Sequence, residues 1–321
     1  MAQLIKLQDY ISRYELDISR YPSQFVRLKK QHWEQWKSAW ETGGESDIGV
    51  MESISEEIIP EKPRLFGKLK GMFKKEEETV QEPILYEANQ RSEMDFPLEH
   101  LRQAENEEEL KQMFLDKVLH FQIKWASSTI TDKSFVDSKY YKDNRLRYLL
   151  QRFPDTFLVL YQPVFLLKKA PVELEVMLLT PTGIWCLVFL EEEDHAAFSG
   201  SADHFWLKKI RETEKKVLNP ILAAGRMEKI VKQLFYLYEV DLPIQTAVIS
   251  RNGYIDYPDP PGNLVLLDRR SYEGWFQKMR AFSSPMKSMQ IRAAKALLEY
   301  CQTTCYRRPE WEQEKQAGHD E

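Results

Sequence analysis

The sequence predicts an α/β protein in which helices cover one central sheet. Three apolar, strand-like segments follow one another closely, at residues 157–167, 173–180 and 183–190. The last segment is apolar throughout, which is typical of a strand buried on both faces. The connections are short, and one of them holds Pro181-Thr182-Gly183, which favours a tight turn. Strands this apolar need cover on both faces, and helical patterns before and after them can supply it.

The composition indicates a globular chain without a strong electrostatic bias. The 321 residues are 43% hydrophobic and 12% aromatic, enough for one large domain or two modest ones. The net charge of -5 gives no general attraction to nucleic acid, so such binding would need a local patch. No run approaches the roughly 20 apolar residues of a membrane span. The N-terminus lacks the apolar core of a signal peptide, and three cysteines give no disulfide framework. We therefore expect a cytoplasmic protein.

Residues 1–41 are expected to form an N-terminal helical hairpin. The first helix is predicted by apolar residues at helical spacing, namely Leu4, Leu7, Ile11 and Tyr14. The second opens at Pro22 and carries Trp33, Trp36 and Trp40 among basic residues. Interleaved aromatic and basic residues could stack bases and neutralise phosphate. We favour a Trp face that docks on the main domain, because charge beside buried Trp is usual in an amphipathic helix.

Residues 42–98 are expected to form a flexible linker. An acidic stretch comes first, followed by the basic segment 62–75 and by further acids. The apolar residues of this segment fall on one helical face, which is typical of a membrane-surface or partner-binding helix. Against a stable helix, Gly67 and Gly71 each cost about 1 kcal/mol of helix propensity. The flanking acids also oppose an anionic surface, so a disordered linker is the favoured interpretation.

The remaining chain is expected to hold a helical region at 99–138, an α/β domain at 139–282, and a C-terminal helix and tail at 283–321. A helix at 138–153 leads directly into the three central strands. Asn219 is predicted to cap a later helix, with Pro220 at its first position. Beyond the three strands, the patterns predict two helices, two strands and two closing helices, over 205–218, 220–238, 242–250, 263–267, 271–282 and 285–304.

The order αβββαβ and several motifs resemble the NERD, or nuclease-related, domain of the PD-(D/E)XK superfamily, over roughly residues 140–280. Glu173-Leu174-Glu175 stands where that family has E-I-D, and Thr180-Pro181-Thr182-Gly183 matches its T-P-x-G. Trp206 and Asn219-Pro220 fall at later positions of the pattern. The resemblance implies a PD-(D/E)XK nuclease-like sheet core with N-terminal and C-terminal helical additions. In such a core, carboxylates hold Mg²⁺ and a Lys orients the attacking water.

The departures from this pattern imply that the nuclease chemistry is lost. The positions of the family's E-V-K fall on Val188-Phe189-Leu190. Glu175 replaces the Asp of the second strand, and Asp143 remains from the acid of the first helix. These two remnants cannot place Mg²⁺ in near-octahedral geometry, so no cofactor is expected. We therefore expect a catalytically inactive NERD-like protein, a binding or scaffold module for a protein partner or for nucleic acid.

An alternative is a divergent metal-dependent nuclease with a displaced acidic site. The acidic run after the third strand supplies Glu191 and Glu192, which could bind Mg²⁺ together with Glu175. We favour a solvated strand-end loop, because runs of acids usually have that role.

Three binding surfaces are predicted. Nucleic acid could bind the helix expected at 205–218, through Lys208, Lys209, Arg211, Lys215 and Lys216, together with Arg226, Lys229 and Lys232 of the following helix. Interspersed acids dilute that potential, so a solvated helix face is the alternative. A protein partner is expected at the Trp-rich helices or at segment 62–75, and a membrane surface at 62–75 is a less favoured alternative.

Overall fold

The computed structural model describes residues 1–42, 104–191 and 193–309. The chain divides into two compact units, one made of Met1–Lys29 with Leu115–Glu321 and the other of Lys30–Phe114. Segment 62–75, Glu192 and the end of the C-terminal tail lie outside the described residues. The domain boundaries expected above remain a prediction. Within the described part of the chain, no helix has the length and apolar character needed to cross a bilayer.

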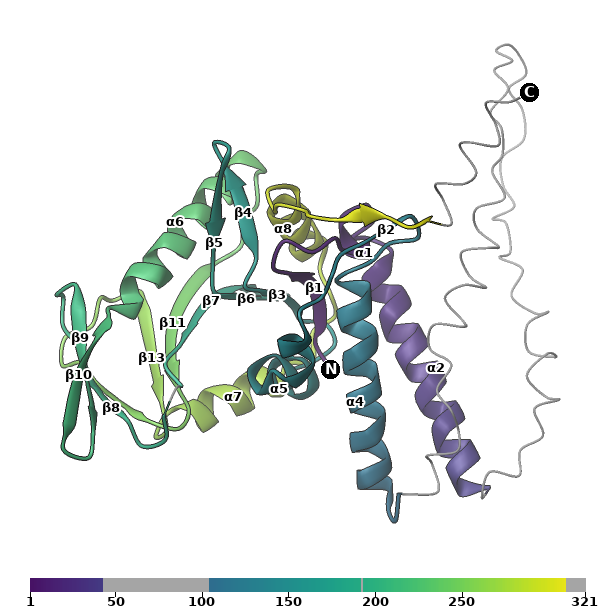
Figure 1. Ribbon diagram of the computed structural model, residues 1–321, viewed down its shortest axis with the longest axis horizontal. Helices are drawn as coiled ribbons and strands as arrows, with labels where there is room; N and C mark the ends of the chain where they lie inside the picture. The colour runs from purple at the N-terminus through teal and green to yellow at the C-terminus, as the bar shows by residue number, and fades with distance from the viewer. Residues whose placement is uncertain (43–103, 192, 310–321) are drawn as a thin grey trace, which may run out of the picture. The chain divides into compact units, whose positions relative to one another are not determined.

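A six-stranded mixed sheet forms the core of the larger unit (Figure 1), in the order β1-β3-β6-β7-β11-β13. Its strands are β1 (Gln3–Leu7), β3 (Leu158–Tyr161), β6 (Val176–Thr180), β7 (Gly183–Phe189), β11 (Ile244–Ser250) and β13 (Leu264–Asp268). β3, β6 and β7 run antiparallel to one another, whereas β1 is parallel to β3 and β11 is parallel to both β7 and β13. The α/β class predicted from the three apolar segments is confirmed.

Helices cover both faces of this sheet. On one face, α5 (Asn144–Arg152) and α7 (Tyr272–Arg280) share a hydrophobic core with the strands. On the other, α6 (Pro220–Leu237) packs on β7 and β11, and α8 (Ser288–Glu299) packs on β6. Successive residues of a strand point to opposite faces, so Leu187 and Val188 of β7 are both buried. Each such side chain contributes about 1.5–3 kcal/mol relative to exposure.

Two predicted local features are confirmed. The Asn219 side chain accepts a hydrogen bond from the Ile221 amide at 3.0 Å, and Pro220 opens α6. The turn from Thr180 to Gly183 joins β6 to β7, with these two residues paired. A Cβ on Gly183 would lie 2.8 Å from the carbonyl oxygen of Pro243, so this position has no room for a side chain.

The N-terminal helix expected from Leu4 and Leu7 is wrong, because Gln3–Leu7 is strand β1. Its backbone pairs with β3, and all five residues are buried. The spacing of the apolar residues alone indicates a helix. In the structure, the backbone hydrogen bonds of this apolar segment are made instead to the open edge of the sheet. The short helix α1 (Arg13–Leu16) and the predicted long helix, α2 (Tyr21–Glu41), follow. In the smaller unit, Trp33 and Trp36 of α2 contact Phe114 of α4 (Glu107–Trp125).

The helix expected at residues 205–218 is also wrong. The segment is a hairpin of β9 (Phe205–Ile210) and β10 (Thr213–Leu218), in a second sheet with β8 (Ala197–Ser199) and β12 (Tyr254–Asp256). Buried Trp206 and Lys208 alternate with exposed neighbours in β9, which is the period of a strand. The lysines of this segment obscure the alternation in the sequence, because buried Lys208 has the same charge as its exposed neighbours.

Two further short ribbons and one 3₁₀ helix complete the larger unit. Val164–Leu167 (β4) pairs with Ala170–Glu173 (β5), and Asp132–Lys133 (β2) pairs with Tyr306–Arg307 (β14). The 3₁₀ helix η3 (Ser138–Lys142) precedes α5, and Asp143 lies between the two.

Candidate functional site

An open hollow of about 550 Å³ lies beside the β4–β5 hairpin. Its lining consists of Gln162, Pro171, Val172, Glu173, Leu174, Glu175 and Arg226. Glu173 ends β5, and Glu175 comes directly before β6. Arg226 comes from α6. The volume falls in the usual range for a small-molecule site.

Glu175 is the half-buried acid of this hollow. Burial raises the pKa of its carboxyl and is the largest effect. The positive charges of Arg145 and Arg226 lower this pKa, and the negative charge of Glu173 raises it further. Among the described residues, the Glu175 side chain has no hydrogen-bond or ion-pair partner. A carboxyl that holds its proton to higher pH, beside a second carboxylate and an Arg, is suited to proton transfer.

Asp143, the second predicted remnant, caps α5. One carboxylate oxygen accepts hydrogen bonds from the amides of Arg145 and Leu146, at 2.9 and 3.0 Å. The other accepts a hydrogen bond from the Tyr161 hydroxyl at 2.6 Å. Burial, and then this hydrogen bond and the charge of Asp143, raise the pKa of Tyr161. The carboxylate therefore holds the start of α5 against β3.

Glu191 lies two residues beyond the end of β7 and is bound by Arg251, which comes directly after β11. Arg251 Nη2 donates to Glu191 Oε2 at 2.7 Å, Nε donates to Oε1, and the Arg251 amide adds a bond of 3.2 Å. The Arg251 guanidinium also lies 4.3 Å from the ring centre of Tyr148. Arg145 Nε approaches Glu191 at 3.8 Å. Glu191 is thus engaged by two arginines, and Glu192 lies outside the described residues.

The predicted basic residues do not share one helical face. In the β9–β10 hairpin, Lys208 pairs with Lys215, and Lys209 pairs with Glu214. Only 4% of the Lys208 side chain is exposed, and its ammonium group lies 3.2 Å from Glu193. Arg211 lies in the turn, with a φ of 53°, and Lys216 pairs with Leu207. A contact of these residues with phosphate stays a prediction.

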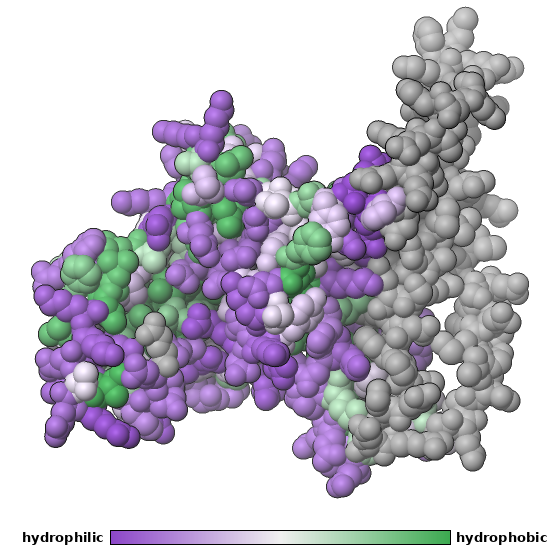
Figure 2. All heavy atoms as spheres, viewed as in Figure 1, coloured by the Kyte–Doolittle hydropathy of each residue, from purple (hydrophilic) through white to green (hydrophobic). Residues whose placement is uncertain are grey.

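The hairpin also carries an apolar face. Phe205, Leu207 and Leu218 are exposed there, and Figure 2 shows hydrophobic residues gathered around the hairpin and the start of α6.

Arg145 is not predicted as a site residue from the sequence, and Arg226 is predicted only as one of several phosphate contacts, without a link to Glu175. Arg145 lies two residues after Asp143, and Arg226 lies on the helix that Asn219 caps. Their convergence on Glu175 depends on how α5 and α6 pack around the sheet, for which the sequence carries no local signal.

The hollow has neither histidine nor a cluster of metal ligands. Four of the six histidines lie in the described residues, and none of them lines it. His120 stacks on Tyr141, His195 lies beside Arg269, and His204 contacts Phe205. No group of three or more His, Cys, Asp or Glu residues in the described ranges could hold a metal ion. Any acid–base chemistry in the hollow therefore falls to its two carboxyl groups.

A protein with a named activity is similar to part of this chain. The RNA 2',3'-cyclic phosphodiesterase of Geobacillus stearothermophilus is 37% identical over 124 residues, which are 38% of this chain and 36% of that protein. The chain therefore matches about a third of the length of this curated relative. No family model matches the chain, and no solved structure matches it.

This comparison corrects the functional predictions made from the sequence. The relative is named for cyclic phosphodiester chemistry, so the resemblance to a NERD nuclease domain is wrong. The inactive NERD scaffold and the displaced metal-dependent nuclease are wrong for the same reason. The motifs misled because Thr-Pro-x-Gly and Asn-Pro are turn and cap signals, which many α/β proteins need for local folding alone.

Proposed function

We propose that the hollow around Glu175 hydrolyses a 2',3'-cyclic phosphodiester at the end of an RNA. The observation that carries this proposal is the grouping of Glu173, Glu175 and Arg226 in one hollow. The printed name of the partial relative supports the choice of substrate.

Two carboxyl groups and an Arg can together perform this reaction. Glu173 accepts a proton from water as the water oxygen bonds to phosphorus. Glu175, whose pKa is raised, donates its proton to the ribose oxygen as the bond between that oxygen and phosphorus breaks. Arg226 binds the phosphoryl oxygens, on which negative charge develops. The pattern is that of two carboxyl groups given different roles by their environments.

A second hollow next to Arg226 suits the rest of a nucleotide. It measures about 510 Å³ and is lined by Ile221, Leu222, Gly225, Arg226, Lys229 and Ile230. Because Arg226 lines both hollows, a phosphate held by this residue leaves an apolar surface beside it for a ribose or a base.

The order of elements also supports a proposal that concerns the fold alone. When the strands outside the main sheet (β4, β5 and β8–β10) are left aside, α5, β3, β6, β7, α6 and β11 have the order αβββαβ, which is the order of a PD-(D/E)XK-type sheet. The catalytic positions of that fold have no counterpart, since Val188 is buried and Leu190 is aliphatic.

Hydrolysis of a 2',3'-cyclic mononucleotide by the purified protein tests the proposed function. Glu175→Gln should reduce the rate by about 10²–10⁴-fold, the usual contribution of one general acid. Arg226→Gln should also reduce the rate. The matched controls are Glu214→Gln and Arg280→Gln, which alter exposed residues on β10 and α7 and should leave it unchanged. No hydrolysis by the unmodified protein, or full activity in Glu175→Gln, would contradict the proposal.

A further inference from the structure

The β2–β14 ribbon presents two aromatic rings and a cation on its outer face. Phe135, two residues beyond β2, has 79% of its surface exposed. Its ring stacks on Tyr306 of β14, with centres 4.4 Å apart and planes 23° apart. Lys133 pairs with Tyr306 across the ribbon, and its ammonium group lies 5.3 Å from the Tyr306 ring. Phe135 and Lys133 therefore both contact the ring of Tyr306.

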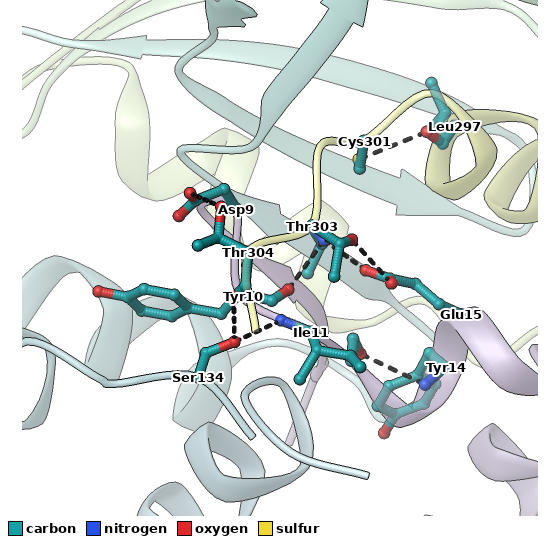
Figure 3. Close-up of polar contacts among 12 residues, drawn as sticks. Asp9, Tyr10, Ile11, Tyr14, Glu15, Ser134, Leu297, Cys301, Thr303 and Thr304 are labelled. Atoms are coloured by element: carbon teal, nitrogen blue, oxygen red, sulfur yellow. Dashed lines mark hydrogen bonds and ion pairs between the residues drawn. The ribbon is translucent and has the colours of Figure 1, made fainter. Parts of the chain in front are cut away.

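The inner face of the ribbon is fixed to the rest of the larger unit. Ser134 Oγ accepts a hydrogen bond from the Ile11 amide at 2.9 Å and donates one to the Thr304 carbonyl at 2.6 Å. Thr304 donates through its amide and its hydroxyl to Asp9, both at 2.7 Å. Figure 3 shows Ser134, Ile11, Asp9 and Thr304 joined in this way. The aromatic pair therefore stands on a rigid base.

Buried Lys6 provides a second anchor for the same segment. Its ammonium group donates to Thr303 Oγ1 at 3.0 Å and to the Tyr10 carbonyl at 2.8 Å, and it is paired with Glu15. Thr303 in turn donates to Glu15 Oε2 at 3.0 Å. An exposed Phe gains little from folding by itself, so an anchored, stacked and exposed pair is suited to receive another ring.

We propose that Phe135, Tyr306 and Lys133 form a stacking platform for single-stranded RNA; the choice of RNA rests on the proposed function. A base stacks on the exposed ring of Phe135, because every base has a π face. Lys133 and exposed Arg307 neutralise the phosphates on either side. Asp132 lies opposite Arg307 in the ribbon and offsets part of this charge. The aromatic pair thus provides a stacking surface for a base, and the cations beside it provide partners for the adjacent phosphates.

A continuous backbone path connects the platform to the hollow. β4 forms one strand of the hairpin that lines the hollow. Along its other edge, the amide of Leu166 donates to the Tyr300 carbonyl, and the amide of Gln302 donates to the Val164 carbonyl. The same segment continues through Thr304 to Tyr306 on the platform. An RNA strand that follows it would place upstream nucleotides on Phe135 and its 3' end near Glu175.

Anisotropy of a labelled ten-nucleotide RNA with an unreactive 3' end measures binding to the platform. Phe135→Ala should weaken binding about tenfold or more, as expected from the loss of one stacked base. Phe135→Leu should also weaken binding, because it keeps the apolar volume and loses the π face. Lys133→Gln should reduce the salt dependence by about one phosphate contact. Tyr236→Ala is the matched control, since Tyr236 is 90% exposed at the end of α6.

The outcomes separate the platform from the proposed function. RNA binding that is lost in Phe135→Ala and kept in Tyr236→Ala supports the platform. Absence of cyclic phosphodiester hydrolysis would contradict the proposed function alone and would leave this result standing. Equal RNA binding by the unmodified protein and Phe135→Ala, or no RNA binding at all, would overturn the platform, even where hydrolysis is observed. A thermal unfolding curve for each variant shows that the larger unit is folded, and Phe135→Leu decides the matter if Phe135→Ala unfolds it.

Discussion

Replacement of Asp143 by Ala should destabilise the protein through two distinct losses. The first is the cap of α5, in which Asp143 accepts hydrogen bonds from Arg145 and Leu146; loss of such a cap costs about 1–2 kcal/mol. The second is the hydrogen bond that the buried Tyr161 hydroxyl donates to Asp143; leaving this hydroxyl without its acceptor costs about 1–3 kcal/mol. We expect a total of about 2–5 kcal/mol, which corresponds to a decrease in Tm of about 4–20 °C for a domain of this size.

Urea unfolding of three variants separates these losses. Asp137 caps the exposed start of η3 through the Lys139 amide at 2.9 Å and has no buried hydroxyl to satisfy. Asp137→Ala should therefore cost only about 1 kcal/mol. Tyr161→Phe should cost less in the Asp143→Ala background than alone, because the bond between the two side chains is already absent. Equal costs for Asp143→Ala and Asp137→Ala, or additive costs for Asp143→Ala and Tyr161→Phe, would refute this account of the cap.

Three other predictions concern residues around the sheet. The pKa of Glu175 is higher in the folded protein than in the unfolded chain. The contribution of this carboxyl to stability is therefore fully present below the pKa of the unfolded chain and is lost as the pH rises through the pKa of the folded protein. Glu175→Gln should therefore raise Tm at about pH 8 and change it little at about pH 4; an equal effect at both pH values would contradict this. Glu191→Gln should cost about 3–5 kcal/mol in urea unfolding, because it breaks a largely buried pair with Arg251, against less than about 1 kcal/mol for exposed Glu214→Gln. Gly183→Ala should cost about 1–3 kcal/mol, because its Cβ would meet the Pro243 carbonyl, whereas Gly262→Ala meets nothing within 4 Å; equal unfolding midpoints would argue against the close approach.

The central part of the fold could be predicted because its signals are local. The apolar run at Gly183–Phe189, the turn before it and the cap at Asn219 are each read within a few residues. The two elements predicted wrongly, β1 and the β9–β10 hairpin, depend on distant partners. Gln3–Leu7 becomes a strand because the edge of β3 is free, and that edge lies about 150 residues further along the chain.

The candidate site could be predicted only in part. The sequence predicts Glu175 as an acid of the second strand, and the structure adds that Glu173 and Arg226 line the same hollow and that the charge of Arg145 lowers the pKa of Glu175. Asp143 was identified as a remnant of a metal site, whereas its three hydrogen bonds give it a place in the structure as a helix cap. Sequence motifs do not distinguish a carboxylate that caps a helix from one that faces an open hollow. That distinction requires the packing of α5 and α6 around the sheet.

The most direct test of the central claim follows the phosphorus atom itself. Phosphorus NMR distinguishes a five-membered cyclic phosphodiester from a phosphate monoester, and an RNA that ends in a 2',3'-cyclic phosphate provides the substrate. We predict conversion to a monoester by the unmodified protein, with a rate that falls as the pH rises through the raised pKa of Glu175. An intact cyclic phosphate after incubation with folded protein would contradict the claim, as would conversion that continues unchanged in Glu175→Gln.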